Sequence, residues 1–206
     1  RWEHDLHRGA DRMPLLLHLA LSHYQFEAIH PFRDGNGRVG RILIPLTLCA
    51  HGRLDQPLLY MSAYFEAHRR EYVDRLLRVS TNGDWLGWVS FFLRGVVTCA
   101  SDGLALAEQL VALREKYHAQ VRSARSAGAL AMLVDELFRV PSITISRATQ
   151  KLGSSPASAS ANLRKLAEIG VVREVSGRQR NQLFVAPEIL AFVGRDTGAM
   201  PEPQGD

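Results

Sequence analysis

Chemically capable side chains are densest in one twelve-residue stretch, His30 to Arg41, which reads His-Pro-Phe-Arg-Asp-Gly-Asn-Gly-Arg-Val-Gly-Arg. Gly35 and Gly37 flank Asn36, and glycine lets a backbone approach an anion closely. A helix is expected to begin near Asn36, and the unpaired N–H groups at a helix start favour anions such as phosphate. The stretch therefore predicts a phosphate-binding loop between two helices.

The polar side chains of this stretch suit nucleotidyl or phosphoryl transfer. Asn36 can add a side-chain donor, and Arg38 and Arg41 can each bind phosphate oxygens through a forked guanidinium. Asp34 is a hard oxygen ligand, placed for a Mg²⁺ ion that bridges those phosphates. His30 can accept a proton near neutral pH. No Gly-Lys-Ser/Thr follows the glycines, which excludes a P-loop.

Each part of the stretch has an ordinary structural interpretation when it is taken alone. Gly-Asn-Gly is a common turn signal, and a histidine before proline often caps a helix. Phe32 is apolar within a polar loop, so we expect its side chain to anchor the loop in the helical core. For the other residues, their coincidence within twelve positions favours the functional interpretation.

A helical domain over residues 1–122 is expected to position this loop. Residues 13–29 are apolar almost all round, which is typical of a buried helix, and the His30-Pro31 step ends it. No alternation of period two precedes Leu130, so this domain is predicted to be all-α. Its other expected helices cover residues 36–49, 62–80 and 85–117, the last with Gly95 and Gly103 as weak points.

A small α+β domain over residues 129–193 is expected after a linker of small residues. Three helices followed by a β-hairpin form the plan of a winged helix-turn-helix. Residues 194–206 are rich in proline, glycine and acids, and predict a disordered tail. The expected elements are helices at 130–139, 146–152 and 156–170, with Ser155 as N-cap, a strand at 143–145 and a hairpin of 171–175 with 182–185.

Basic side chains gather in the second domain. Residues 139–186 carry eight basic and two acidic side chains, whereas the whole chain has a net charge of +4. Such a concentration is typical of a surface that faces nucleic acid, although a solvated basic face is the alternative. The residues expected to contact DNA are Arg164, Lys165, Arg178 and Arg180 at phosphates, and Ser158, Ser160 and Asn162 in the major groove.

Composition bears on the cellular compartment. Cys49 and Cys99 lie 50 residues apart among apolar neighbours, which favours free thiols in a reducing cytoplasm over a disulfide or a metal site. The mostly apolar stretch of residues 42–50 contains Pro45 and is too short to cross a bilayer. No basic segment followed by an apolar one opens the chain, so no secretion signal is expected.

Residues 30–41 resemble the signature of the Fic family, His-Pro-Phe-x-Asp/Glu-Gly-Asn-Gly-Arg-x-x-Arg, at all nine specified positions. The resemblance extends roughly from residue 13 to residue 100, through the segments 24–29, 59–62 and 82–85. It implies a mainly α Fic-type domain and an enzyme that transfers AMP from ATP to a hydroxyl of a target protein, or of itself, with Mg²⁺.

The resemblance also implies a role for each motif residue. His30 would deprotonate a serine, threonine or tyrosine hydroxyl, and Asp34 would hold Mg²⁺. The nucleotide would be bound by Gly35, Asn36 and Gly37 at the α-phosphate and by Arg38 and Arg41 at the outer phosphates. Tyr72 is similar to an aromatic residue that lines the adenine pocket, with an ordinary core aromatic as the alternative.

Two departures from the family pattern keep other functions open. Only 29 residues precede His30, so the family's upstream flap hairpin and inhibitory helix are expected to be missing. Val73 stands where many members have a tyrosine, which leaves UMP or phosphocholine as alternative transferred groups. A DNA-binding regulator with an inactive Fic part is a further alternative. Gly37-Arg38, in place of the Asn-Lys of the kinase-like branch, argues against phosphate transfer.

Overall fold

The computed structural model describes residues 13–178 and 182–196, with side chains to residue 192. The chain divides into two compact units, Arg1–Ala105 (unit 1) and Leu106–Asp206 (unit 2). The division falls within helix α6 (Trp85–Val121), earlier than the expected limit at residue 122. The reason is that Leu113, Tyr117 and Val121 of α6 are buried in the hydrophobic core of unit 2.

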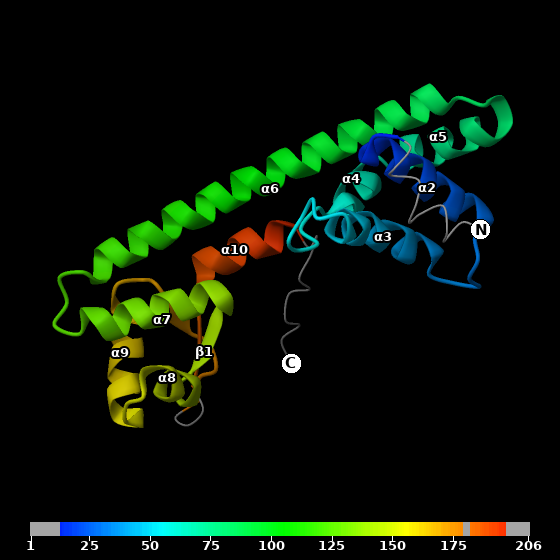
Figure 1. Ribbon diagram of the computed structural model, residues 1–206. Coiled ribbons are helices and arrows are strands. Elements are labelled where there is room, and N and C mark those ends of the chain that lie inside the picture. Colours follow the sequence, from blue (N-terminus) through cyan, green and yellow to red (C-terminus); the bar gives the residue numbers. More distant parts are fainter. Residues whose placement is uncertain (1–12, 179–181, 197–206) are drawn as a thin grey trace. The chain divides into compact units, whose positions relative to one another are not determined.

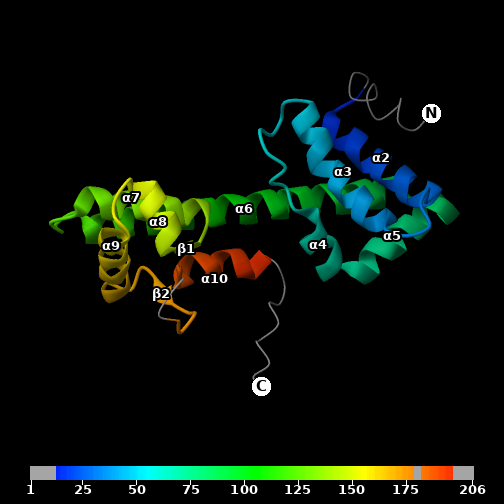
Figure 2. The ribbon, with the colours of Figure 1, turned by 90° about the horizontal axis from the view of Figure 1, so that it is seen from below.

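The regular elements among the described residues of unit 1 are all helices, as the sequence predicts (Figure 1). Helices α2 (Leu15–Ile29) and α3 (Asn36–Ala50) lie side by side, antiparallel, and are joined by residues 30–35, the motif loop (Figure 2). The core of the unit is rich in aromatic rings, with Trp88, Phe91 and Phe92 fully buried. The helices of unit 1 are α2 (Leu15–Ile29), α3 (Asn36–Ala50), α4 (Met61–Ala67), α5 (Arg69–Asn82) and the first part of α6.

Gly40 allows α2 and α3 to pack closely. A Cβ atom at this position would collide with the Glu27 carboxyl and would lie 3.1 Å from the Phe26 ring. Gly40 is itself buried, and its carbonyl oxygen is 3.2 Å from Nδ1 of His23 on α2. The two helices that flank the motif loop are therefore held by a backbone-to-side-chain contact as well as by apolar packing.

Two helices of unit 1 differ in continuity from the sequence-based expectation. The single helix expected over 62–80 is divided at His68, whose Nδ1 atom hydrogen-bonds the Tyr64 carbonyl at 2.9 Å. Conversely, Gly95 does not weaken α6: its missing side chain makes room for the rings and methyls of Tyr64 and Met61. The stop signal before α6 is confirmed, since Gly83 ends α5 with φ +68°.

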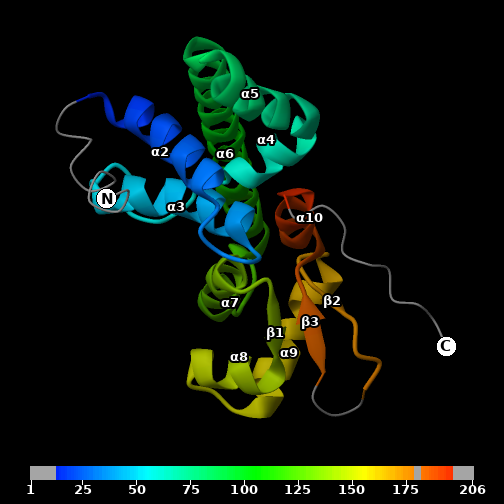
Figure 3. The ribbon, with the colours of Figure 1, turned by 90° about the vertical axis from the view of Figure 1, so that its right-hand side faces the viewer.

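Unit 2 combines helices with a small antiparallel sheet of strand order β1-β3-β2 (Figure 3). Ser155 caps α9 as predicted, by accepting a hydrogen bond from the Ser158 N–H at 3.2 Å. The elements are α7 (Ala127–Arg139), β1 (Ser142–Thr144), α8 (Ile145–Leu152), α9 (Pro156–Glu168), β2 (Arg173–Glu174), β3 (Leu183–Val185) and α10 (Pro187–Asp196).

Helix α10 is absent from the expected elements and takes up residues 194–196 of the expected tail. Pro187 opens the helix, a position that suits proline, and Ile189 is buried in the core of unit 2. The remaining tail residues, 197–206, lie outside the described part of the chain.

Helix α6 is long and apolar enough, by length and composition alone, to cross a membrane, and little of its apolar stretch is buried. Polar residues interrupt the apolar stretches of this helix, so no contiguous apolar run in the sequence marks it as a possible membrane span. A single helix of this kind is weak evidence for a membrane span.

Candidate active site

His30 ends helix α2 in an unusual backbone conformation. Its φ and ψ are 50° and 58°, the left-handed region, and it is the one non-glycine residue with positive φ in the described chain. Its N–H donates to the Phe26 carbonyl at 3.0 Å, and its Nδ1 atom is 3.4 Å from the Glu27 carbonyl oxygen. The Nε2 edge of the exposed ring is thereby left for other partners.

Asn36 braces the motif loop. Its side chain is buried, with 2% of the residue exposed. Oδ1 accepts the Phe32 N–H at 2.9 Å, and Nδ2 donates to the Phe32 carbonyl at 2.6 Å. The amide expected to bind phosphate is therefore engaged within the loop, while the backbone N–H of Asn36 remains at the start of α3.

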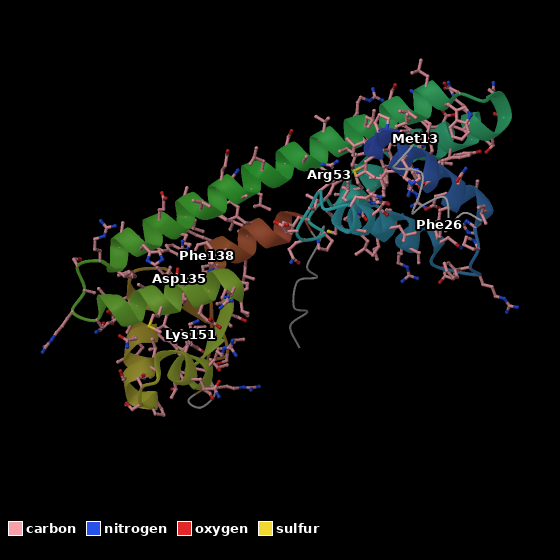
Figure 4. The ribbon with its side chains drawn as sticks, in the orientation of Figure 1. Met13, Phe26, Arg53, Asp135, Phe138 and Lys151 are labelled. Carbon is pink, nitrogen blue, oxygen red and sulfur yellow. The ribbon has the colours of Figure 1, made fainter. Side chains whose placement is uncertain are left out.

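The Phe32 side chain does not anchor the loop in the core, so that expectation was wrong. The residue is 51% exposed and its ring centroid is 6.3 Å from that of Phe26, which Figure 4 labels on α2. The loop is fixed instead through the Phe32 backbone, because Asn36 pairs with both of its polar groups.

The start of α3 carries the expected anion-binding features. Gly35 is the N-cap residue with φ +83°, a conformation that favours glycine. Asp34 is highly exposed; its Oδ1 accepts the Gly35 N–H at 2.7 Å, and its Oδ2 is 3.5 Å from Nη2 of Arg38. The Asp34 carboxylate, the start of α3 and the Arg38 guanidinium thus all lie within residues 34–38.

Arg41 lies over the first turn of α3. A Cβ atom on Gly37 would be 3.0 Å from Nη1 of Arg41, so the absence of a side chain at Gly37 lets the guanidinium lie there. Within the described residues Arg41 forms no hydrogen bond or ion pair. His30, Asp34, Arg38 and Arg41 therefore all belong to the loop and the helix start that follows it, as the sequence predicts.

The residues present fit a Mg²⁺ ion that is shared with a nucleotide. The described residues contain no cluster of three or more His, Cys, Asp or Glu side chains, so an all-protein cage is absent from them. Mg²⁺ commonly binds one or two carboxylates together with substrate phosphates and water. Asp34 is the exposed carboxylate beside the predicted phosphate site, and its oxygens retain free lone pairs.

Tyr72 lies in the core and not on the motif loop. It is 9% exposed, its ring stacks on Phe65 with centroids 4.6 Å apart, and its hydroxyl is 3.0 Å from Nε2 of His23. Burial also raises the pKa of the Tyr72 hydroxyl. The surroundings are those of a core aromatic residue, the alternative to an adenine-lining one.

His23 is a buried partner of the motif helix that sequence reasoning missed. Its Nδ1 contacts a carbonyl oxygen, that of Gly40, and must therefore donate, which leaves Nε2 to accept from the Tyr72 hydroxyl. Burial lowers the pKa of His23 to about 4, so the ring is neutral at neutral pH. Its apolar surroundings, stacked on Phe65 and Trp88, become visible only once the helices are packed.

Glu27 is the second residue that sequence reasoning left without a role. Its side chain comes from α2 and lies against Gly40, next to Arg41 on α3. The Oε1 atom is buried without a hydrogen-bond partner. The sequence signal that points to Glu27 is its position three residues before His30, on the helix face that carries His23.

Known proteins match the part of the chain that carries this site. Residues 1–48 match the sequence model of the Fic/DOC family. A probable protein adenylyltransferase of Aquifex aeolicus is 49% identical over 47 residues, 23% of this chain. The proteins named protein adenylyltransferase Fic of Aedes aegypti and Culex quinquefasciatus are each 34% identical over 87 residues, 42% of this chain. Each match covers 15% of the relative's own length.

The matched segment contains the complete His30–Arg41 motif, helix α2 and all of helix α3 except its last two residues. Through this segment, the chain is similar to the Fic/DOC family over residues 1–48.

Proposed function

We propose that the motif loop transfers AMP from ATP to a serine, threonine or tyrosine hydroxyl of a protein. The hydroxyl oxygen forms a bond to the α-phosphorus, the bond from that phosphorus to the oxygen bridging to the β-phosphate breaks, and pyrophosphate leaves. The hydroxyl proton passes to His30. The observation that carries the proposal is the gathering of His30, Asp34, Arg38 and Arg41 around the start of α3.

Substrate phosphates are held by the start of α3. The helix dipole and the first backbone N–H groups favour the α-phosphate, and the two arginines bind the outer phosphates. The negative charge that builds up during the displacement is then held by groups already in place. The Asn36–Phe32 pair keeps the loop in this form before the substrate arrives.

Asp34 would hold Mg²⁺ beside the phosphates. A bound Mg²⁺ neutralises phosphate charge and orients the leaving pyrophosphate. The carboxylate at present accepts the Gly35 N–H, and this bond fixes its orientation toward the helix start. The names of the matched relatives favour AMP as the transferred group over UMP or phosphocholine.

Replacement of His30 by alanine tests this function. The protein is incubated with ATP and Mg²⁺, and intact-mass spectrometry measures AMP added to itself or to added cell proteins. His30→Ala is expected to reduce the initial rate by about 10²–10⁴-fold, because it removes the general base. His68→Ala is the matched control, since His68 lies on another helix junction of the same unit.

Two outcomes would contradict the proposal. One is unchanged AMP transfer by a His30→Ala protein whose circular dichroism matches the wild type. The other is a protein that adds no mass from ATP but adds the mass of UMP or phosphocholine from UTP or CDP-choline.

We propose as a second function that unit 2 binds duplex DNA as a winged helix, with α9 as the recognition helix. In support, the exposed Arg164 on α9, Arg173 on β2 and Arg178 after it form no hydrogen bond or ion pair within the described residues. By contrast, Arg147 and Lys151 on α8 both pair with the buried Glu136 carboxylate, at 2.8 Å each.

The residues proposed here to contact DNA are fewer than those expected from the sequence. Asn162 is 5% exposed and faces the core, so its placement in the groove was wrong. Lys165 Nζ donates to Ser126 Oγ at 3.0 Å, and Arg180 lies outside the described residues. Ser158 and Arg164 remain on the exposed side of α9.

Salt dependence tests the DNA interface. Fluorescence anisotropy with a labelled duplex is measured over a series of salt concentrations, with wild type, Arg164→Ala and the control Lys116→Ala, whose ammonium is paired with Glu188. Arg164→Ala is expected to reduce the log–log slope by about 0.9, the contribution of one phosphate contact. No binding at micromolar protein in low salt, or equal slopes for all three proteins, would contradict a DNA interface.

A further inference from the structure

Two acidic side chains, Glu168 and Glu174, lie within the basic segment of residues 139–186. A carboxylate on a DNA-binding surface repels the phosphates and so lowers the affinity that neighbouring arginines provide. Glu168 is exposed on α9 and forms no hydrogen bond or ion pair within the described residues. Glu174 differs from it, because the Glu174 carboxylate, at the end of β2, accepts several hydrogen bonds.

Glu174 holds the turn of residues 174–177, here called the wing turn. Its Oε1 atom accepts hydrogen bonds from the Ser176 N–H, at 2.8 Å, and from the Ser176 hydroxyl. Its Oε2 atom accepts from the Gly177 N–H at 3.3 Å. Gly177 has φ +61°, a conformation that favours glycine. Both carboxylate oxygens of Glu174 are therefore used to fix the backbone two and three residues later.

Ser176 links the wing turn to the neighbouring strand. Its hydroxyl donates to Glu174, and the same oxygen accepts a hydrogen bond from the Leu183 N–H at 3.3 Å. The Val175 N–H donates to the Leu183 carbonyl at 3.0 Å, which extends the pairing of β2 with β3 by one residue (Figure 3). The wing turn is thus fixed to the sheet immediately before Arg178.

The acid and the arginines next to the wing turn differ in what they bind. Arg173 precedes Glu174, Arg178 follows the wing turn, and both are exposed without a hydrogen bond or ion pair within the described residues. The hydrogen bond from the Ser176 hydroxyl is the main cause that lowers the pKa of Glu174, so the carboxylate is charged at neutral pH. This charge is directed to the turn, and both guanidinium groups remain available to an anion.

We propose that Glu174 is a positioning residue for a phosphate contact of unit 2: its carboxylate fixes the wing turn so that Arg178 is held in place to meet the DNA backbone. The inference rests on the proposed DNA binding, because it names what positions one of its contacts. Glu174 does not itself touch the DNA. Loss of an acid from a basic surface ordinarily strengthens DNA binding, whereas the positioning role requires that loss of Glu174 weakens it.

The sign of the effect on DNA affinity tests this role. Fluorescence anisotropy with a labelled duplex, over a series of salt concentrations, compares the full chain with Glu174→Ala and with the control Glu168→Ala. Glu174→Ala is expected to reduce the log–log slope by about 0.9, and the affinity at about 0.1 M salt by about five- to tenfold, because one phosphate contact is lost. Glu168→Ala removes the same charge and is expected to raise the affinity by up to about twofold, with an unchanged slope.

Two further variants test whether Glu174 acts through the wing turn and through Arg178. Ser176→Ala keeps the net charge and removes the hydroxyl between Glu174 and Leu183, so it is expected to lower the slope and the affinity in the same direction. In an Arg178→Ala protein, the further change Glu174→Ala is expected to cause no additional loss of slope, since the group it positions has been removed.

The outcomes separate the positioning role from the proposed DNA binding. Wild type that binds DNA, together with a Glu174→Ala protein that binds it as tightly or more tightly, overturns the positioning role alone. The same loss of slope with and without Arg178 also overturns it. If circular dichroism shows that Glu174→Ala does not fold, Ser176→Ala carries the comparison, and a slope equal to that of wild type overturns the inference. Wild type that binds no duplex overturns the DNA-binding function and the inference with it.

Discussion

At the scale of single residues, the chemistry and its support come from different side chains. The motif supplies exposed groups at the helix start, whereas His23 on α2 joins α2, α3 and α5 through the Gly40 carbonyl and the Tyr72 hydroxyl. Since burial disfavours the charged form of the imidazole, protonation of His23 should weaken unit 1.

The stability of unit 1 is expected to fall in mild acid. In the folded protein the pKa of His23 is lowered from 6.5 to about 4, so between these values the unfolded chain binds a proton that the folded one does not. Stability from this group is therefore present above pH 6.5 and is lost as pH falls toward 4, by about 2 kcal/mol between pH 7 and pH 5. Urea unfolding followed by tryptophan fluorescence measures it, because all three tryptophans of the chain belong to unit 1 and Trp88 stacks on His23.

His23→Gln isolates this effect, because the raised pKa of Glu27 acts in the opposite direction in acid. The variant is expected to lose most of the difference between the two pH values, whereas the control His68→Gln keeps it. If the His23→Gln protein retains the full difference, His23 is not the responsible group.

At the scale of secondary-structure elements, α6 contributes to two cores. Its first part buries Trp88, Phe91 and Phe92 in unit 1, and its last part buries Leu113 and Tyr117 in unit 2. Asp135 on α7, labelled in Figure 4, accepts hydrogen bonds from Arg114 and His118 of the same last part. The end of α6 is thus an integral helix of unit 2 and not a linker.

A pair of fragments tests this role of α6. Residues 106–206 are expected to unfold cooperatively, whereas residues 123–206, which begin at the linker foreseen from sequence, lose Leu113, Tyr117 and Val121 from the core. At about 1.5–3 kcal/mol for each buried side chain, the shorter fragment should be less stable by at least about 4 kcal/mol. Thermal circular dichroism of both fragments gives the comparison, and equal midpoints would show that α6 is dispensable for unit 2.

At the scale of the whole molecule, folding pairs some basic side chains of residues 139–186 with a carboxylate from another segment of the chain. Two of the eight basic side chains in residues 139–186, Arg147 and Lys151, pair with Glu136, which lies outside that window. These two bonds lower the pKa of Glu136 to about 2, so the carboxylate stays charged above strongly acidic pH. The cations that remain for a partner are fewer than the sequence count indicates.

Local signals in the sequence determined most element limits and the location of the candidate site. The His30-Pro31 step ends α2, Gly35 precedes α3, and Ser155 with Pro156 opens α9, as foreseen. Such signals act within a few residues of one chain segment, so they can be recognised without knowledge of the fold. The complete motif likewise locates the site because its residues lie in one loop and the helix turn after it.

The tertiary structure alone decided which side chains meet across helices and which faces they turn to solvent. The contacts of His23 with Tyr72 and of Glu27 with α3 join residues on different helices, so no local pattern contains them. Asn162 and Ser160, two positions apart, point to different sides of a helix that turns about 100° per residue. Only the packing of α9 on its neighbours decides that the Asn162 side is the buried one.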